Sequence, residues 1–434
     1  MSATFLSASR ARQRDLRIKM SSATRQRYST AWPVESSIPP VVGAIEPMHG
    51  HGTHYLLHVG IGLESLAATE VAQTVSASTV TILQGKVAFR SDAPFSELRR
   101  LRSAESLSLL CWVAQMPSMP VADDEAFAAA FHALLASHVL PQVPALERAW
   151  RAATGLDRIA APSVPFRVTA RRSGCDTGSL TRQDLGRWLA EAWHDASDGG
   201  FTATAHDYEL EILLQWSGAQ VCIELPAHRE SRRLTDGRLS ARSYCPVPAL
   251  HAPIGWALAS LAKIQPGWRV LDPMCGRGGV LIEAALLQPQ AAACVGCDKH
   301  AEQLEGAATN AQAAMKLAGA QPLLLLRADA TRLPLADGSV DAVLSDMPFG
   351  RKHGRREGLY AAALQEWRRV LRPGGRAVLL TTRKAELEAA LNGNPRTDAT
   401  GAVGAQPASW IKLGRHHLMV GALTACAHVI ARPR

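Results

Sequence analysis

Residues 269–287, RVLDPMCGRGGVLIEAALL, decide the fold of the C-terminal half of the chain. An apolar run ends at Asp272, a glycine-rich turn follows, and an apolar helical segment comes next. Glycine at the carboxyl end of a strand lets a ligand approach the backbone closely. The pattern therefore predicts a strand, a ligand-binding turn and a helix. Taken alone, it also fits a plain tight turn around Gly276 and Gly278.

Apolar runs and helical segments keep alternating beyond this stretch. The strand-like runs are ACVGCD, PLLLLRAD, VDAVLSD and RAVLL, and the tail WIKLGRHHLMVGALTACAHVI adds further strand. Such alternation is typical of a parallel sheet with helices on both faces. We therefore predict an α/β, Rossmann-like domain over residues 246–434.

Acidic residues end three successive predicted strands. Asp298 lies 20 residues after Gly278, a spacing at which an acid binds ribose hydroxyls, and Asp329 can reach an adenine amine. The turn is not G-x-G-x-x-G, so a nucleoside with an amino-acid tail fits better than a dinucleotide. Singly, each acid is more often a helix cap or a turn former. The predicted cofactor-binding residues are Asp272, Pro273, Cys275, Gly276, Gly278, Asp298, Asp329 and Asp346.

The motif SDMPFG at Ser345–Gly350 ends the fourth of these strands. Asp346 offers a carboxylate, and a carbonyl of Met347 or Pro348 offers a second, rigidly placed acceptor for an exocyclic amine. Phe349 offers a flat face on which a base can stack. We predict these four residues to be catalytic, chiefly by positioning the amine. The plainer alternative is a strand-ending loop with a buried Phe.

These elements together resemble the class I S-adenosylmethionine-dependent methyltransferases. VLDPMCGRGGVLIEAA resembles their first motif, RRVLRPGGRAVLL the entry to their fifth strand, and the DxPF of SDMPFG the motif of amino-group methyltransferases. The resemblance implies a seven-stranded sheet and S-adenosylmethionine as the cofactor. No metal site is predicted, because Cys294 and Cys297 would point to opposite faces of one strand.

The N-terminal half resembles two further modules. VPFRVTARRSG and YELEILLQWSGAQVCIEL are similar to a THUMP RNA-binding domain, and HYLLHVGIGLESLAATEV with LQGKVAFRS is similar to the α+β ferredoxin-like domain that accompanies it. The predicted domains are a basic arm and linker at 1–52, a ferredoxin-like domain at 53–150, a THUMP domain at 151–245 and the methyltransferase domain at 246–434.

Two arginine clusters in this half could bind RNA phosphates. They are Arg167, Arg171 and Arg172, and later Arg229, Arg232 and Arg233. For any one of these arginines, a solvated face is the plainer interpretation.

The combined architecture resembles THUMP-domain-containing RNA guanine-N2 methyltransferases of the eukaryotic branch, which act on tRNA or U6 snRNA. WALASLAKI and IKLGRHHLMVGAL favour the U6 member. Three residues depart from the family pattern: His251, in a loop over the cofactor, and Arg277 and Gly279 in the turn. Two alternatives remain: an amino-group methyltransferase for adenine N6 or protein glutamine, and a non-catalytic RNA-binding or chaperone protein.

The resemblance also implies partners, a structured RNA and a small zinc-binding activator subunit. In this fold the third strand, PLLLLRAD, lies at an edge of the sheet, where an uncovered leucine run invites pairing. We expect the activator to add a strand near Leu323–Leu326.

Charge and hydropathy bear on where the chain acts. The net charge is +9, but residues 1–32 hold seven Arg or Lys against Asp15 alone. This Arg-rich, acid-poor segment is either a transit peptide or a disordered basic arm. We expect a location in the nucleus or cytoplasm, or in an organelle if the segment is a signal. No apolar run is long enough for a membrane span.

Overall fold

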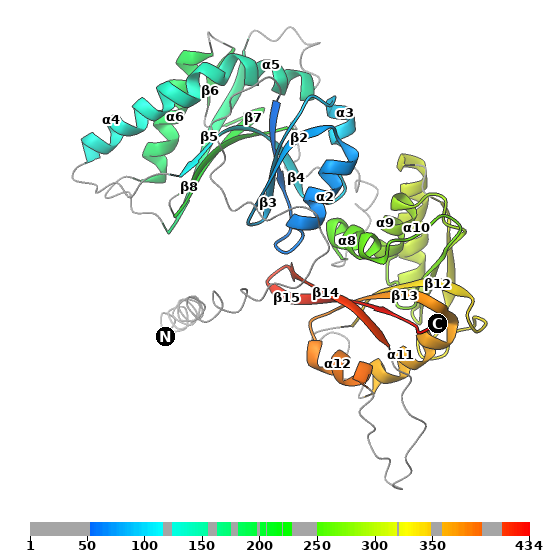
Figure 1. Cartoon of the computed structure of the whole chain (residues 1–434). Coiled ribbons are helices and arrows are strands. Elements are labelled where there is room, and N and C mark those ends of the chain that lie inside the picture. Colours follow the sequence, from blue (N-terminus) through cyan, green and yellow to red (C-terminus); the bar gives the residue numbers. More distant parts are fainter. Residues whose placement is uncertain are drawn as a thin grey trace, which may run out of the picture. The chain divides into compact units, whose positions relative to one another are not determined.

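The computed structural model describes residues 53–115, 124–154, 163–174, 181–197, 200–204, 206–218, 220–227, 250–318, 321–348, 358–392 and 410–434. They belong to one compact unit, Val42–Arg434, and contain an eight-stranded and a seven-stranded sheet (Figure 1). The predicted arm at 1–52, Phe349 and the arginine cluster at 229–233 lie outside the described residues. No helix within the described ranges is long and apolar enough to cross a membrane.

The eight-stranded sheet has the order β2-β3-β1-β4-β8-β7-β5-β6. Its strands are β1 (Thr53–His58), β2 (Ala77–Leu83), β3 (Lys86–Ser91), β4 (Ser106–Gln115), β5 (Val164–Ser173), β6 (Phe201–Ala203), β7 (Leu210–Ser217) and β8 (Gln220–Pro226). β2 with β3 and β7 with β8 form antiparallel hairpins, and each turn contains a glycine with positive φ, Gly85 or Gly218. Antiparallel pairing of β4 with β8 makes the sheet continuous.

The helices of this region cover one face of the sheet (Figure 1). They are α2 (Glu64–Thr74), α3 (Phe95–Leu98), α4 (Asp124–Leu134), a π-helical turn (Leu135–Val139), a 3₁₀ turn (Leu140–Gln142), α5 (Val143–Thr154) and α6 (Arg182–Ala196). Alternate strand residues such as Leu57, Leu107 and Ile223 pack in the main core, and their neighbours face the other side. The domain boundary predicted at 150–151 lies inside α5, and the division of this region into two domains stays a prediction.

The seven-stranded sheet confirms the predicted α/β architecture. Its order is β11-β10-β9-β12-β13-β15-β14. The strands are β9 (Arg269–Asp272), β10 (Ala293–Asp298), β11 (Leu323–Arg327), β12 (Val340–Asp346), β13 (Leu371–Thr381), β14 (Ile411–Val420) and β15 (Leu423–Ala431). The strands from β9 to β13 pair in parallel, and β15 pairs antiparallel with both β13 and β14.

Helices lie on both faces of this sheet (Figure 1). They are α8 (Ala252–Ala262), α9 (Gly279–Leu287) and α10 (Ala301–Ala318) on one face, and α11 (Leu359–Val370) and α12 (Lys384–Asn392) on the other. Successive strand residues therefore belong to different core clusters: Val270 to one, Leu271 to the other. Cys294 and Cys297 are separated in the same way, which is the opposite-face placement expected of them.

The Pro373–Gly374 pair lies inside β13. Pairing with β12 passes directly from Leu371 to Arg376, so the intervening residues bulge out of the ladder. Because Pro has no N–H to donate and Gly374 has a φ of +73°, a bulge accommodates both residues without ending the strand.

The carboxylate of Glu70, on α2, anchors the segment that precedes β4. It accepts the backbone N–H groups of Arg102 at 2.7 Å and of Ser103 at 2.9 Å. We predict that Glu70→Ala lowers the free energy of unfolding by about 2–4 kcal/mol, because two backbone donors lose their acceptor. Urea titrations check this against Glu97→Ala, an exposed acid expected to change stability by less than about 0.5 kcal/mol. Equal losses in the two variants would contradict the anchoring role.

Candidate cofactor and catalytic site

Carboxylates gather where the central parallel strands end. Asp272 is the last residue of β9, Asp298 is the last residue of β10, and Asp346 is the last residue of β12. Because these strands are adjacent and parallel, their carboxyl ends share one edge of the sheet, where ligands bind in open α/β folds. Burial, and then the negative charges of Asp346 and Asp298, raise the pKa of Asp272 well above its ordinary value. The structure thus brings together three of the four predicted acids.

The Asp298 carboxylate ties the glycine-rich turn to the end of β10. One carboxylate oxygen accepts the Gly276 N–H at 3.1 Å, and the other accepts the His300 N–H at 2.9 Å. Gly276 and Gly278 have φ values of +49° and +78°, which favour glycine. A Cβ at Gly278 would also lie 3.3 Å from Ala307 Cβ. Glycine at these two positions therefore follows from the backbone conformation and, at Gly278, also from close packing against α10.

The remaining residues of the turn point into the fold. Cys275 is buried and donates its N–H to the Cys297 carbonyl at 2.9 Å, and burial strongly raises the pKa of its thiol. The Met274 N–H, just after Pro273, donates to Asp272 Oδ1 at 3.0 Å. These contacts set the course of the backbone, and they account for Cys275 as a packing residue.

The departures from the family pattern have local structural roles. The Arg277 side chain lies along α10, where its Cγ would be 3.3 Å from a Cβ at Gly306. Its carbonyl accepts the Asn310 side-chain N–H at 3.0 Å. Gly279 is the first residue of α9, and His251 precedes α8 with its Nδ1 3.8 Å from a Glu105 oxygen.

Asp346 is the most unusual group at this edge. Burial raises the pKa of its carboxyl group to about 7. Its Oδ1 is buried and has no hydrogen-bond partner among the described residues. A buried polar atom without a partner costs folding free energy, and such atoms are rare in folded proteins. The arrangement indicates an acceptor that is held ready for a donor on a ligand.

Tyr360 positions the residues that follow Asp346. Its hydroxyl lies 3.3 Å from the Pro348 carbonyl and 2.9 Å from Thr381 Oγ1. The Met347 N–H donates to the Leu380 carbonyl at 2.9 Å, and the Met347 side chain is buried in the core. Sequence reasoning missed Tyr360 and Thr381, although a Tyr in the first turn of a helix that faces the motif was a possible signal.

The other predicted residues lie apart from this edge or have local partners. Asp329 follows the end of β11 at Arg327 by two residues, is exposed, and accepts from the Thr331 N–H at 2.9 Å, as a turn former does. Arg167 pairs with Glu211 at 2.8 Å and stacks on the Tyr208 ring. Arg171 and Arg172 are exposed near the end of β5, in the other sheet.

Comparisons with known proteins agree with this geometry. Residues 241–404 match the UPF0020 family, described as an RMKL-like methyltransferase domain. A U6 snRNA (guanine-N(2))-methyltransferase, THUMPD2 of Bos taurus, is 38% identical over 50% of this chain and 41% of its own length. A tRNA (guanine(6)-N2)-methyltransferase of Thermus thermophilus is 35% identical over 52% of this chain and 64% of its own. The chain thus spans less than half the length of the first of these relatives.

Solved structures extend the likeness to both sheets. The crystal structure of TrmN from Thermus thermophilus matches with a TM-score of 0.65 and 25% identity, over 88% of this chain and 99% of that one. Both the family match and the observed strand order place the acids described above in a methyltransferase fold. The seven-stranded sheet therefore has the class I methyltransferase fold, and residues 241–404 are similar to the UPF0020 methyltransferase domain.

Proposed function

We propose that this chain is an S-adenosylmethionine-dependent methyltransferase that forms N2-methylguanosine in RNA. One observation carries the proposal: Asp346 ends β12 with a buried carboxylate oxygen that has no partner in the described part of the chain. It lies on the sheet edge that also carries Asp272 and the glycine-rich turn. An amino group is a donor that this acceptor suits.

The residues at the edge fit S-adenosylmethionine, which supplies an electrophilic methyl group and carries positive charge when bound. Asp272 and Asp346 are mutually repelling carboxylates in a buried setting, and a cation would relieve that repulsion. Each oxygen of the Asp298 carboxylate accepts one backbone N–H, from Gly276 or His300, and has a further lone pair that can accept a ribose hydroxyl of a nucleoside. We propose Asp272, Gly276, Gly278 and Asp298 as the main cofactor contacts.

The guanine amino nitrogen, which receives the methyl group, is a weak nucleophile because its lone pair is delocalised into the ring. Asp346 accepts one N–H of the amine, and the Pro348 carbonyl has a lone pair for the other, since Tyr360 engages only one. The nitrogen gains the methyl group and loses one proton, for which Asp346 is the nearest proposed acceptor. Catalysis here consists of orienting the amine and stabilising developing charge.

The substrate we propose is U6 snRNA or tRNA, since relatives named for both are similar to this chain. Nucleoside analysis of methylated RNA separates this from the alternatives. N2-methylguanosine supports the proposal, N6-methyladenosine favours the adenine alternative, and RNA binding without any product favours a non-catalytic protein. We further propose that the protein acts in the nucleus or cytoplasm. The alternative is that residues 1–32 are a signal that directs it to an organelle.

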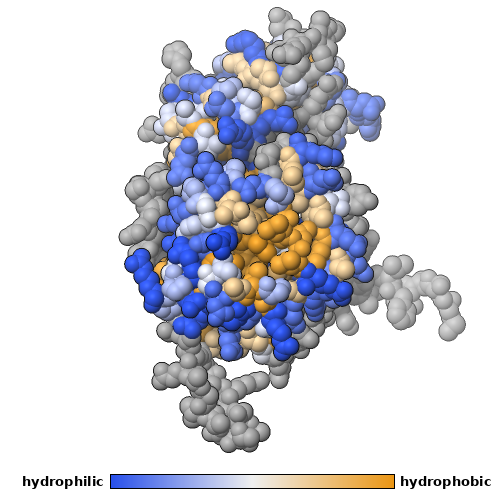
Figure 2. Space-filling view, turned by 90° about the vertical axis from the view of Figure 1, so that its right-hand side faces the viewer, coloured by the Kyte–Doolittle hydropathy of each residue, from blue (hydrophilic) through white to orange (hydrophobic). Residues whose placement is uncertain are grey.

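We also propose that a small zinc-binding activator pairs with β11. The strand lies at the edge of its sheet, as predicted. Leu323 and Leu325 pack against the core, whereas Leu324 and Leu326 are 55% and 37% exposed. Figure 2 shows a broad apolar area on one face of the molecule. An exposed apolar edge strand favours pairing with another chain.

Replacing the proposed acceptor tests the site. We predict that Asp346→Asn lowers kcat for methyl transfer at least about 100-fold, because the amide cannot accept as the carboxylate does. Asp337→Asn, which changes an acid that is 80% exposed, is the matched control and keeps the wild-type rate. Radiolabelled methyl transfer to transcripts of U6 RNA and tRNA measures both. Equal activity in the two variants would sink the assignment.

The pH profile tests the ionisation of the same carboxyl group. With a pKa of about 7 in the unliganded chain, Asp346 is mostly protonated at pH 6 and cannot serve as a two-lone-pair acceptor. We predict that kcat/KM, measured with both substrates limiting, is about tenfold lower at pH 6 than on a plateau above pH 8. A flat profile over this range would contradict the role, while the Asp337→Asn chain should repeat the wild-type curve.

If the activator pairs with β11, substitutions on this strand should remove the small subunit and its zinc from the purified protein. Wild-type protein purified from its own cells should carry about one equivalent of zinc in a co-eluting small subunit. Leu324→Asp with Leu326→Asp should lose both, because charges on the edge strand block pairing. Leu423→Asp, at an exposed leucine of β15, is the control and should keep them. A soluble and active wild-type monomer without a partner would rule the activator out.

A further inference from the structure

An ion pair links the region of the eight-stranded sheet to the methyltransferase domain. Arg102 lies between α3 and β4, and Glu283 lies on α9. Arg102 Nη2 and Nε donate to the same Glu283 oxygen, at 2.6 Å and 3.0 Å. The side chains are only 17% and 2% exposed, so solvent screens the pair little. The reaction proposed above makes no use of either residue.

Glu283 lies about one helical turn beyond the glycine-rich turn. α9 begins at Gly279, and the Ile282 N–H donates to the Gly278 carbonyl at 2.9 Å. Gly255 of α8 packs against the same place, since a Cβ there would lie 3.1 Å from Glu283 Cγ and 3.4 Å from the Gly279 carbonyl oxygen. The Glu283 side chain therefore fills the contact between α8 and the start of α9, and a shift of this side chain would disturb the glycine-rich turn.

Arg102 is presented by a segment whose backbone is fixed at both ends. Glu70 of α2 accepts the Arg102 N–H at 2.7 Å. The Glu105 N–H donates to the His58 carbonyl, at the end of β1, at 2.8 Å. The guanidinium therefore reaches α9 from a firm base in the first sheet.

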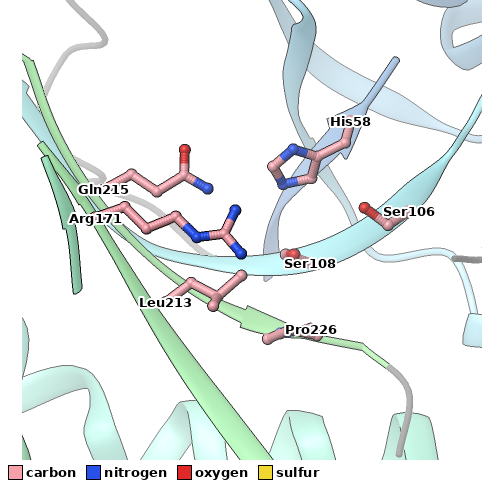
Figure 3. Close-up of a pocket in the computed structure, with 7 residues that line it drawn as sticks. All are labelled: His58, Ser106, Ser108, Arg171, Leu213, Gln215 and Pro226. Carbon is pink, nitrogen blue, oxygen red and sulfur yellow. The ribbon is translucent and has the colours of Figure 1, made fainter. Parts of the chain in front are cut away.

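A buried carboxylate fixes the strands on both sides of β4, which follows this segment. Glu224 of β8 is fully buried; His58 Nε2 of β1 lies 2.6 Å from one of its oxygens, and the Gln215 side-chain N–H of β7 donates to the other at 2.9 Å. Figure 3 shows His58 and Gln215 on opposite sides of a cavity, with Ser108 of β4 between them. Burial raises the pKa of Glu224, but the hydrogen bond and charge of His58 and the charge of Lys86 hold it below its ordinary value. The ionised carboxylate thus ties β1, β7 and β8 together around β4.

A second contact fixes the same region to β14. The Met419 N–H donates to the carbonyl of Ile61, which follows β1, at 2.9 Å. Gly62 has a φ of +94°, and a Cβ there would lie 2.2 Å from the His417 carbonyl oxygen, so only glycine fits this close approach. Two separate contacts, one at β14 and one at α9, therefore hold the first sheet to the methyltransferase domain.

We propose that Arg102 is a positioning residue for S-adenosylmethionine: it compensates the charge of Glu283 and so keeps the start of α9, with the glycine-rich turn, in the geometry that binds the cofactor. A buried carboxylate that loses its partner is strongly unfavourable, and it either takes up a proton or moves toward water. Movement toward water would separate α9 from α8. The identity of the cofactor rests on the proposed function, whereas the dependence of the turn on the ion pair does not.

The test is S-adenosylmethionine binding by the full chain, measured by isothermal titration calorimetry. Arg102→Gln should raise Kd about tenfold, because it leaves Glu283 uncompensated. Combining Arg102→Gln with Glu283→Gln should return Kd to within about threefold of the wild type, since no buried charge is then left without a partner. Arg102→Lys keeps the charge and should give a Kd between these values. It also serves as the test variant if Arg102→Gln does not fold.

The matched control is Arg151→Gln on α5. Its ion pair with Glu147 is similarly sheltered, at 18% and 17% exposure, but lies within one helix that has no contact with α9 to transmit. This variant should bind S-adenosylmethionine as the wild type does. In methyl-transfer assays Arg102→Gln should raise KM for S-adenosylmethionine about tenfold with kcat within about twofold of the wild type, and its affinity for RNA should not change. A residue needed only for stability would lower Tm without producing this split.

Three results would overturn the proposal. One is an Arg102→Gln chain, or Arg102→Lys if the former does not fold, that binds S-adenosylmethionine as tightly as the wild type. Another is a double variant that binds as weakly as Arg102→Gln, because the loss would then not depend on the charge of Glu283. The third is equal weakening in Arg151→Gln. A chain that shows the expected binding pattern but methylates no guanine in RNA would instead overturn the proposed function alone.

Discussion

The burial of two carboxyl groups, to which charge repulsion adds at Asp272, is the constraint on which the rest of the C-terminal domain depends. Asp272 and Asp346 end adjacent parallel strands, and their burial raises the pKa of both. For Asp346 the folded pKa of about 7 lies above its ordinary 3.8. The folded chain therefore holds this proton more tightly than the unfolded chain does, and stability is lost as the pH rises from 3.8 through 7. The fold tolerates an energetic cost at the place where a cationic ligand would remove it.

The unfavourable burial of these carboxyl groups must be offset by stabilising contacts around them. Here those contacts fix the backbone next to Asp272 and Asp346. The Asp298 carboxylate accepts the Gly276 N–H in the turn. The Tyr360 hydroxyl contacts both the Pro348 carbonyl, after Asp346, and Thr381 Oγ1. Preorganisation of this kind reduces the reorganisation that charge development would otherwise require.

Much of this could be predicted from the sequence, because the signals are local. The strand ending in Asp272, the glycines with positive φ and the acid at Asp298 each follow from a short run of residues. Three features could not be predicted, because they depend on contacts between distant segments or on backbone registration. Tyr360 meets Pro348 only after α11 packs, the Pro373–Gly374 bulge is fixed by pairing with β12, and the buried Glu224 network needs strands from both parts of the first sheet.

The junction of β4 and β8 has a consequence for how the chain is made. Leu109 pairs with Leu225, so the middle of the first sheet cannot close until all the sequence between them exists. During synthesis β4 leaves the ribosome before β8. Its other neighbour, β1, pairs with one edge of β4, so the second edge stays unpaired until β8 is made. Loop closure over such a span is slow, and exposed edges are where nascent chains aggregate. Folding of the first sheet during synthesis is thus timed by the arrival of β8.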